Sequence, residues 1–155
     1  MYVRVIPTPI GLLLARASER ALRSVEIRLG VEEKERTSPL LEELADQVER
    51  YFARQGETFL ALPLDYSGLQ ASRVALYEAV RRIPMGETRS YAEMARLTGL
   101  TPRAVGAALR ANPFFLVVPA QRVIHADGRL GGFAGREDLK DWLLCHEGAH
   151  PHLRP

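Results

Sequence analysis

The sequence predicts an α+β protein of two domains, a small α/β domain over residues 1–66 and a helical domain over residues 67–155 that contains a helix-turn-helix. Three observations support this prediction. Apolar and polar residues alternate in three short runs before residue 30, as they do in β-strands with one buried face. The segment 63–68 is rich in turn-forming residues and is predicted to be a linker. Two short segments after it each open with a helix-capping residue.

Three strands are expected in the first domain. Residues 2–6 alternate, Pro7-Thr8-Pro9 interrupts them, and residues 10–15 are the expected neighbouring strand. Residues 22–29 alternate again. One face of this third strand is expected to carry Leu22, Ser24, Glu26 and Arg28.

A helix should follow the strands, because Ser38 is a good N-cap residue and Pro39 fits the first helical position. Its buried stripe is expected from four residues at helical spacing: Leu41, Leu44, Val48 and Phe52. Gly56 is expected to close the helix, since glycine adopts the left-handed conformation at helix ends. We interpret this first domain as a scaffold.

A further helix is expected after the linker. It should end before Ile83-Pro84, because the residue that precedes a proline disfavours helical backbone. Its buried stripe is expected from four residues: Ala71, Val74, Tyr77 and Val80.

The helix-turn-helix is predicted from its capping residues. Ser90 and Glu93 have the spacing of a capping box, and Gly99 is expected to end the helix that they start. Thr101-Pro102 repeats the N-cap-plus-proline pattern and opens a helix that runs to about Ala111. Two short helices around a tight turn with a glycine suit this motif.

The second helix of the motif has two distinct faces. Its inward face is expected to hold Val105, Ala108, Leu109 and Asn112. Arg103, Gly106 and Arg110 share another face, where the absence of a side chain at Gly106 would let a phosphate backbone approach closely. The same pattern also fits a solvated amphipathic helix whose glycine serves helix packing.

The net charge of +2 is unevenly distributed. Residues 1–66 hold nine basic and eleven acidic residues, a net −2, whereas residues 67–155 hold twelve and eight, a net +4. One interpretation of this split is chance variation of solvated surface charge. The alternative is that the second domain carries a surface that faces a polyanion.

The bulk composition, with 46% hydrophobic and 26% charged residues, is that of a soluble globular protein. No apolar run approaches the roughly 20 residues of a membrane-spanning helix. The first residues lack the basic and apolar regions of a secretory signal. The single cysteine cannot form an internal disulfide, which fits a reducing compartment. We expect a cytoplasmic, nucleoid-associated monomer.

The segment Val117–Ile124 is predicted to form a rigid corner. Pro119 must leave any strand ladder, because proline has no backbone N–H and a fixed φ. Ala120 and Gln121 therefore lie between two apolar pairs. A glycine-rich loop over residues 128–135 follows the corner, so the corner and the loop suggest a pocket.

Several motifs carry a family resemblance. They are Asn112-Pro113, Val118–Ile124, Gly128, Gly131-Gly132-Phe133, Lys140 and Leu143–Gly148. In this order they resemble the O6-alkylguanine-DNA alkyltransferases over roughly residues 68 to 148. The resemblance implies a ribonuclease-H-like first domain and a winged-helix-like second domain that binds DNA.

The corner departs from that family at the position of its chemistry. The alkyltransferases carry Pro-Cys-His-Arg-Val, and their cysteine accepts the alkyl group. Here Ala120 and Gln121 take the places of the cysteine and the histidine. Alkyl transfer needs a thiolate and a base that forms it, and neither alanine nor glutamine supplies one. The chain therefore resembles the alkyltransferase-like branch, and we predict that it has no catalytic residue.

Cys145-His146-Glu147 does not replace the missing acceptor. Consecutive helical residues lie about 100° apart around the axis, so their side chains do not converge. The packing stripe of this helix is expected from Leu139, Trp142, Leu143 and His146, which makes Cys145 a small structural residue. Glu147 matches the glutamate that the active family couples to its histidine. Because that partner is missing, we expect a residual or structural role for Glu147.

The resemblance implies a DNA-binding set: Ser90, Tyr91, Arg103, Gly106, Arg110, Asn112 and Arg122. Arg103 would enter the minor groove and fill the vacancy in the base stack. Tyr91 would press the target phosphate and help to turn the nucleotide out, and Arg110 would contact phosphate. Tyr91 also suits the edge of a core, and both arginines also suit a solvated surface. Asn112 matches a hinge, although asparagine before proline is also a common turn former.

The resemblance also implies an alkylguanine pocket: Tyr91, Leu109, Pro119, Ala120, Val123, Gly132, Phe133, Ala134 and Gly135. The last four lie in a lid that runs from Gly131 to Gly135. The active family has tyrosine and serine where this chain has Phe133 and Ala134, so backbone groups and Arg122 would read the guanine edge. A methyl group at Ala120 also leaves more space, and we expect bulky O6-alkyl groups to fit. Leu109 and Val123 equally suit an ordinary core.

The leading hypothesis is a DNA-damage sensor that is not an enzyme. It would bind duplex DNA through the minor groove, flip O6-alkylguanine into the pocket, and flag it for nucleotide excision repair proteins, as the resemblance implies. An alkyltransferase that uses Cys145 and a sequence-specific helix-turn-helix regulator remain alternatives. We expect no cofactor and no metal, because the four histidines lack ligand spacing.

Overall fold

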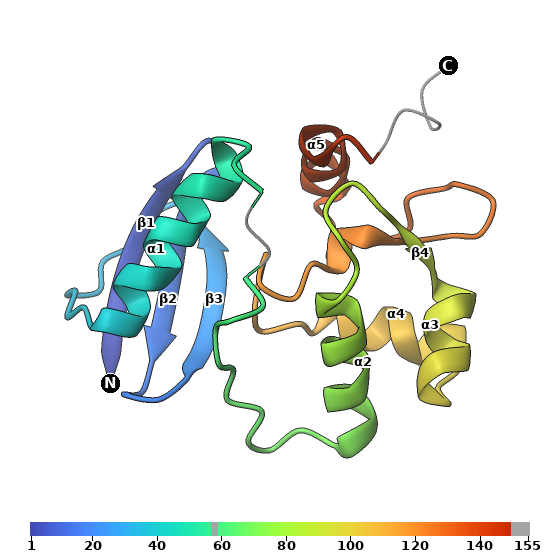
Figure 1. Cartoon of the computed structure of the whole chain (residues 1–155), viewed down its shortest axis with the longest axis horizontal. Helices are drawn as coiled ribbons and strands as arrows, with labels where there is room; N and C mark the ends of the chain where they lie inside the picture. Colours follow the sequence, from blue (N-terminus) through green and yellow to red (C-terminus); the bar gives the residue numbers. More distant parts are fainter. Residues whose placement is uncertain (57–58, 150–155) are drawn as a thin grey trace. The chain divides into compact units, whose positions relative to one another are not determined.

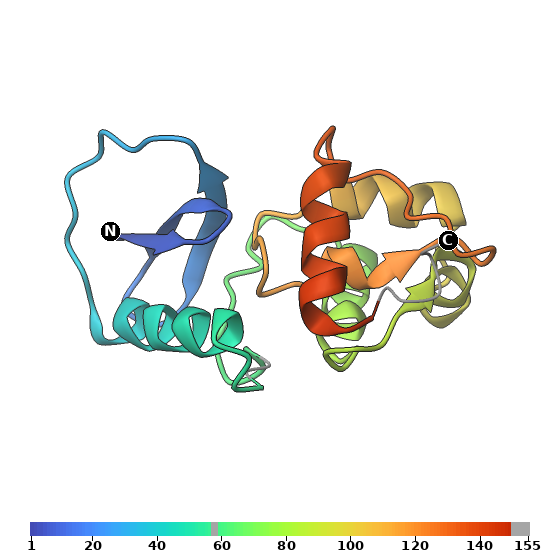
Figure 2. The same ribbon diagram turned by 90° about the horizontal axis from the view of Figure 1, so that it is seen from above.

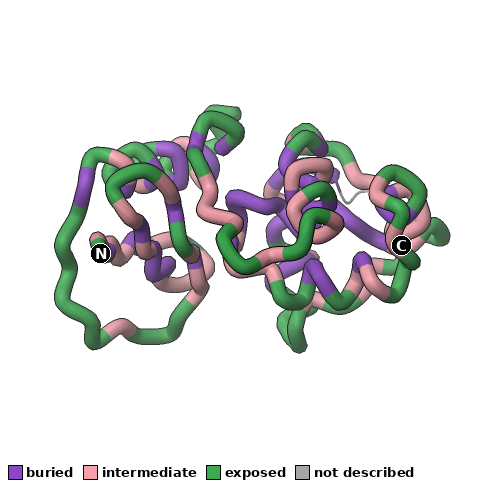
Figure 3. The backbone as a smooth tube through the Cα atoms, turned by 90° about the horizontal axis from the view of Figure 1, so that it is seen from below, coloured by how far each residue is buried: buried purple, intermediate pink, exposed green. Residues whose placement is uncertain are grey.

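The computed structural model describes residues 1–56 and 59–149, and the chain separates into two compact units (Figure 1). The first unit contains residues 1–67 together with 113–117, and the second contains residues 68–112 and the chain from 118 onward. Buried and exposed stretches alternate along the backbone of both units (Figure 3), as expected for elements with one buried face. No helix within the described ranges is long and apolar enough to span a membrane.

The first unit is a three-stranded antiparallel sheet with one helix. Strands β1 (Tyr2–Thr8), β2 (Gly11–Ala17) and β3 (Leu22–Arg28) lie in that order, and α1 (Pro39–Phe52) packs against β1 and β2 (Figure 2). Strand β1 ends at Thr8, two residues beyond the predicted end. It continues through Pro7, which pairs with Leu12. The sheet tolerates this proline because β1 is an outer strand.

Two predicted details of this unit are wrong. The simple alternation of β3 is interrupted by a register shift, since Leu22 pairs with Ala17 and Ser24 with Arg16. Leu22 and Val25 are therefore both buried.

Helix α1 ends at Phe52, before the predicted closure at Gly56. Arg54 adopts the left-handed conformation, with φ of 61°, and the next amide donates to the Arg50 carbonyl at 2.9 Å. The last buried position of the stripe is Tyr51, and Phe52 is only half-buried.

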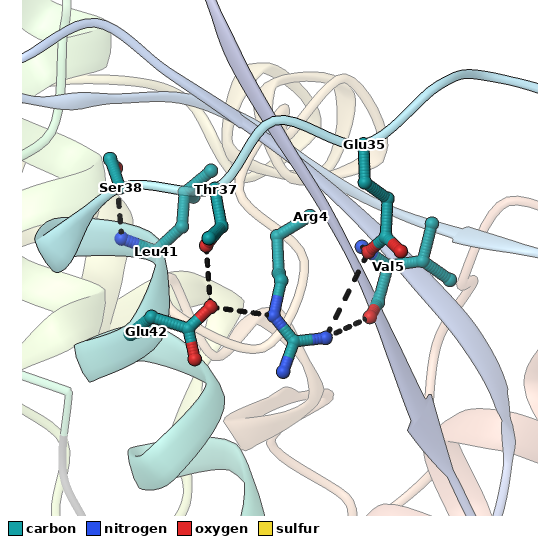
Figure 4. Close-up of polar contacts among 7 residues, drawn as sticks. All are labelled: Arg4, Val5, Glu35, Thr37, Ser38, Leu41 and Glu42. Carbon is teal, nitrogen blue, oxygen red and sulfur yellow. Dashed lines mark hydrogen bonds and ion pairs between the residues drawn. The ribbon is translucent and has the colours of Figure 1, made fainter.

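A polar cluster joins the start of α1 to β1 (Figure 4). The Ser38 hydroxyl accepts a hydrogen bond from the Leu41 amide at 3.3 Å, which confirms the predicted N-cap. Glu42 accepts hydrogen bonds from the Thr37 hydroxyl and from Arg4 Nε. These two bonds, chiefly that from Thr37, hold the pKa of Glu42 below its ordinary value.

The outer edge of β3 is covered by two segments that are distant in sequence. Leu22 exchanges backbone hydrogen bonds with Pro63 and Asp65, and Val25 does so with Pro113 and Phe115. The sequence assigns residues 113–117 to the second domain. The structure places them in the first unit because these bonds satisfy the edge of the sheet.

The second unit contains the predicted helix-turn-helix. Helix α3 (Tyr91–Thr98) starts with both hydrogen bonds of the Ser90–Glu93 capping box, each of 3.0 Å, and ends at Gly99 with φ of 77°. Helix α4 (Pro102–Arg110) starts at Thr101, whose hydroxyl accepts from the Ala104 amide at 3.1 Å. The short strands β4 (Arg89–Ser90) and β5 (Val123–Ile124) pair in parallel.

Helices α2 (Ala71–Arg81) and α5 (Glu137–Glu147) bury only half of each predicted stripe, Tyr77 and Val80 in α2 and Leu139 and Leu143 in α5. In α2 the buried side chains are Leu76, Tyr77, Val80 and Arg81, and Ala71 is exposed. In α5 they are Leu139, Lys140, Leu143, Leu144 and Glu147. Trp142 is 38% exposed and stacks on His146, with ring centroids 5.0 Å apart, so neither belongs to the packing stripe.

Candidate nucleic-acid interface and pocket

The corner between Val117 and Ile124 is buried throughout. As predicted, the chain turns after Pro119, and Ala120–Arg122 form the short 3-10 helix η1. The Arg122 amide donates to the Pro119 carbonyl at 2.9 Å, which tightens the turn. Helix α5 packs on η1, and Leu144 of α5 contacts Ile124 of β5. Helix α5 therefore holds η1 and β5 of the corner rigidly in place.

A buried polar network surrounds the position where the alkyltransferases have their base. The Gln121 amide donates to Glu147 Oε2 at 2.8 Å. Arg122 donates to both carboxylate oxygens, at 2.8 and 3.2 Å, and also to the Ile83 carbonyl at 2.7 Å. The side chains of Arg122 and Glu147 are 3% and 0% exposed. Each hydrogen bond described for this network therefore joins two groups of the protein itself.

This network corrects one expectation and agrees with another. Arg122 was expected to contact DNA and to read the guanine edge, but its guanidinium is buried and bound to Glu147 and Ile83. Glu147 was expected to keep a residual or structural role without the histidine, and Gln121 binds it there with an amide donor. A carboxamide cannot take a proton near neutral pH, so the network holds Glu147 without providing a base.

The acceptor position itself carries a methyl group. Ala120 is 5% exposed at the start of η1. Cys145, the one cysteine of the chain, lies half-buried on α5 between Leu144 and His146.

Tyr91 lies at the start of α3, where two side chains from later segments contact it and a glycine lies beside its hydroxyl. Lys140 Nζ donates to the Tyr91 hydroxyl at 3.2 Å and to the Val123 carbonyl at 2.7 Å. The rings of Tyr91 and His125 lie 4.9 Å apart, and a Cβ atom added at Gly131 would lie 2.4 Å from the Tyr91 hydroxyl. Burial raises the pKa of Tyr91, and the positive charge of Arg110 opposes that rise. Tyr91 is thus both at the edge of a core and fixed in place.

Helix α4 shows the two predicted faces. Val105, Ala108 and Leu109 are buried. Arg103 and Arg110 are exposed on the other side, and a Cβ atom at Gly106 would meet only the Arg110 guanidinium, at 3.7 Å. The phosphate backbone of a DNA duplex could therefore approach the α4 backbone closely.

Asn112 connects this helix to the corner. Its side-chain amide donates to the Val118 carbonyl at 3.0 Å, which fits the predicted hinge between helix and pocket. Ser90 is 9% exposed, and its hydroxyl accepts the capping hydrogen bond from Glu93. Ser90 therefore positions the start of α3.

The predicted pocket residues fall into two groups. Leu109, Pro119, Ala120 and Val123 are buried at the corner and on α4. Gly132, Ala134 and Gly135 are exposed, and Phe133 is half-buried. Ala134 and Gly135 both adopt left-handed backbone, with φ of 51° and 79°. The predicted lid residues therefore lie at or near the surface in this structure, whereas the other four predicted pocket residues are buried.

A surface hollow of about 310 Å³ opens beside Tyr91. It is lined by Tyr91, Ala92, Pro102, His125, Ala126, Asp127 and Arg129. No local sequence pattern marks His125 or Lys140 as neighbours of Tyr91, because the two residues lie 34 and 49 positions away along the chain.

Burial of the Lys140 ammonium makes stability depend on pH. Burial lowers the pKa of Lys140 from 10.5 to about 8, and the charge of Glu137 opposes this only in part. Between those two values the unfolded chain binds more protons, so the free energy of unfolding should rise with pH. We expect the wild type to gain on the order of 1–2 kcal/mol between pH 7.5 and 9.5, relative to Lys140→Met. Urea unfolding of both proteins at the two pH values measures this. Parallel pH dependences would contradict it.

Comparison with known proteins gives matches along nearly the whole chain. Residues 1–66 match the family model for the ribonuclease-like domain of 6-O-methylguanine DNA methyltransferase, and residues 71–149 match that for its DNA binding domain. A Thermus thermophilus protein named DNA base-flipping protein is 54% identical over 144 residues, which cover 93% of this chain and 98% of that protein.

Relatives named as methyltransferases are also similar. A methylated-DNA–protein-cysteine methyltransferase of Methanosarcina acetivorans is 35% identical over 157 residues, covering 96% of this chain and 99% of that protein. Among solved structures, Mycobacterium tuberculosis OGT in complex with DNA superposes with a TM-score of 0.79 at 34% identity, covering 97% and 94% of the two chains.

Proposed function

Because the chain belongs to the 6-O-methylguanine DNA methyltransferase family in both of its domains, we propose that it is a DNA-repair protein that binds O6-alkylguanine without repairing it. It binds duplex DNA through the minor groove and turns the damaged nucleotide out of the stack. It then holds the base while other proteins act. The similarity to a protein named for base flipping supports this choice within the family.

The observation that carries the proposal is the chemistry at the corner. A methyltransferase of this family needs a thiolate where the flipped base arrives and a base that generates it. Ala120 offers a methyl group, and Gln121 offers an amide already bound to Glu147. Cys145 lies on α5, and its helical neighbours Leu144 and Glu147 are buried on a different side.

The α4 helix supplies the DNA contacts in this proposal. Arg103 enters the minor groove and fills the space that the flipped base leaves, and Arg110 contacts phosphate. Gly106 allows the backbone of the DNA to lie close between them. Tyr91 presses the phosphate of the target nucleotide. These roles follow from the positions of matching residues in the family and from the exposure of both arginines.

The complex then serves as a signal. A bent duplex with a base held outside the stack is a structure that nucleotide excision repair proteins can recognise, and we propose these as the partners. The small Ala120 side chain leaves room beside the base, so bulky O6-alkyl groups should bind as well as methyl. Equal affinity for damaged and intact duplexes would contradict this part.

One experiment tests the proposal against its alternatives. Duplexes with and without O6-methylguanine are titrated with the protein, and the intact mass of the protein is then measured from the same mixture. We expect a clear preference for the damaged duplex, no gain of one methyl mass, and unchanged O6-methylguanine in the recovered DNA. A mass gain that is lost in Cys145→Ser would identify an alkyltransferase. Affinity that follows base sequence and ignores damage would identify a regulator.

A further inference from the structure

Lys140 is the most unusual side chain near the proposed interface. It is 1% exposed, although an ammonium group is costly to bury. Its charge is met by neutral oxygens, the Val123 carbonyl at 2.7 Å and the Tyr91 hydroxyl at 3.2 Å. A methionine or leucine at this point of α5 would fill the same space without the cost. The position therefore needs another reason for a lysine.

Tyr91 provides that reason, because its side chain is held from several sides. Lys140 Nζ donates to its hydroxyl and lies 5.4 Å from its ring centroid. The His125 ring lies 4.9 Å from the same ring, tilted by 50°. Gly131 leaves no room for a Cβ atom beside the hydroxyl. The hydroxyl is thus directed before any DNA arrives.

We propose that Lys140 is a positioning residue: anchored on the Val123 carbonyl, its ammonium group holds the Tyr91 hydroxyl in the orientation in which Tyr91 meets the target phosphate. This inference rests on the proposed function, in which Tyr91 helps to turn the nucleotide out. A side chain that is already oriented loses less conformational entropy on binding. The effect should therefore be larger for a duplex in which a nucleotide is flipped than for an intact one.

The charge of Lys140 gives the positioning a pH dependence. The groups that face it are the Tyr91 hydroxyl from α3, the Val123 carbonyl from β5 and Glu137 from its own helix. Arg110 of α4 and the His125 ring face Tyr91, to which Lys140 is bound. A phosphate placed at Tyr91 adds negative charge and favours the protonated amine. Since the pKa of Lys140 in the free protein is about 8, DNA binding should take up a proton above that pH.

The affinity for DNA should depend on pH only above neutral values. Below about pH 7 the amine is charged with and without DNA, so affinity should not change with pH. Above about pH 8 the free protein loses the proton that the complex retains, so affinity for the damaged duplex should fall. The fall is at most about tenfold per pH unit.

A double-mutant cycle tests the positioning. Binding of a fluorescent duplex with O6-methylguanine, and of its intact counterpart, is measured for the wild type, Lys140→Met, Tyr91→Phe and the double variant. We expect each single change to weaken binding to the damaged duplex by about tenfold, the loss of one well-placed hydrogen bond. The double variant should be within about twofold of Tyr91→Phe, because the lysine acts through the hydroxyl.

The control is the other lysine of the chain, Lys34, which lies exposed in the first unit. Lys34→Met should keep the wild-type affinity and the loss of affinity between pH 7 and 9.5, whereas Lys140→Met should abolish that loss. Should Lys140→Met fail to fold, Gly131→Ala is the second variant, because its Cβ atom would displace the Tyr91 hydroxyl. It should weaken binding to the damaged duplex by about tenfold as well.

The outcomes separate the inference from the proposed function. If the wild type does not prefer the damaged duplex, the proposed function fails. If it does, but the losses of Lys140→Met and Tyr91→Phe multiply, or the pH profile of Lys140→Met matches the wild type, the positioning role alone is refuted. An unchanged affinity of Gly131→Ala would refute it too.

Discussion

Replacing Glu147 by alanine should destabilise the second unit by about 3–5 kcal/mol, the largest effect on stability that we expect from a single change. The substitution removes the carboxylate that binds Arg122 and Gln121 and leaves the guanidinium buried, with only the Ile83 carbonyl among its described partners. A charge buried without its counter-ion cannot recover the hydration that it lost on folding. Urea unfolding measures the free energy directly.

Two further variants give this measurement its controls. Glu147→Ala combined with Arg122→Met should recover most of the lost stability, because no buried charge then remains unpaired. Arg129→Ala breaks an ion pair whose side chains are 73% and 58% exposed, and it should cost less than about 0.5 kcal/mol. Equal losses for Glu147→Ala and Arg129→Ala would show that the network does not stabilise the fold.

Replacing Arg103 by alanine should reduce affinity for a duplex with O6-methylguanine by about 30-fold and remove the preference over intact DNA. Arg103 is exposed at the start of α4, and in our proposal it occupies the space of the flipped base. Without it, the vacancy in the stack stays unfilled and the extruded nucleotide returns. Affinity is measured for both duplexes at two salt concentrations.

The matched control is Arg110→Ala on the same face of the same helix. A phosphate contact carries no information about damage, so this variant should weaken binding to both duplexes equally. It should also reduce the slope of log affinity against log salt by about one. Arg96→Ala, at an exposed position of α3, should change neither quantity strongly. A preference for damage that survives in Arg103→Ala would exclude the intercalating role.

The capped helices of the second unit could be predicted because their signals are local. The Ser90–Glu93 capping box spans four residues, and Thr101 binds the Ala104 amide three residues on. The same holds for the faces of α4, since a helix of known start fixes which positions share a side. The replacement of the acceptor cysteine by Ala120 can likewise be predicted from a single residue, and it determines the chemistry of the corner.

The contacts that correct or extend the expectations for the candidate site join distant residues. Arg122 binds Glu147 across 25 positions and Ile83 across 39, and Lys140 reaches Tyr91 across 49. No local periodicity encodes such pairs, because they exist only when separate elements pack together. For the same reason the sequence marked Arg122 as a group for DNA and included Lys140 in the family motifs without indicating its contact with Tyr91.

By itself, then, the sequence determined the capped helices, the outward arginines of α4 and the lack of an acceptor at the corner. These depend on backbone hydrogen bonds and side-chain chemistry within one turn or one residue. Only the tertiary structure decided that residues 113–117 complete the first sheet, that Arg122 is held inside by Glu147, and that Tyr91 is fixed by Lys140. Burial makes that difference, because a buried polar group must find its partner wherever the fold brings one within hydrogen-bond distance.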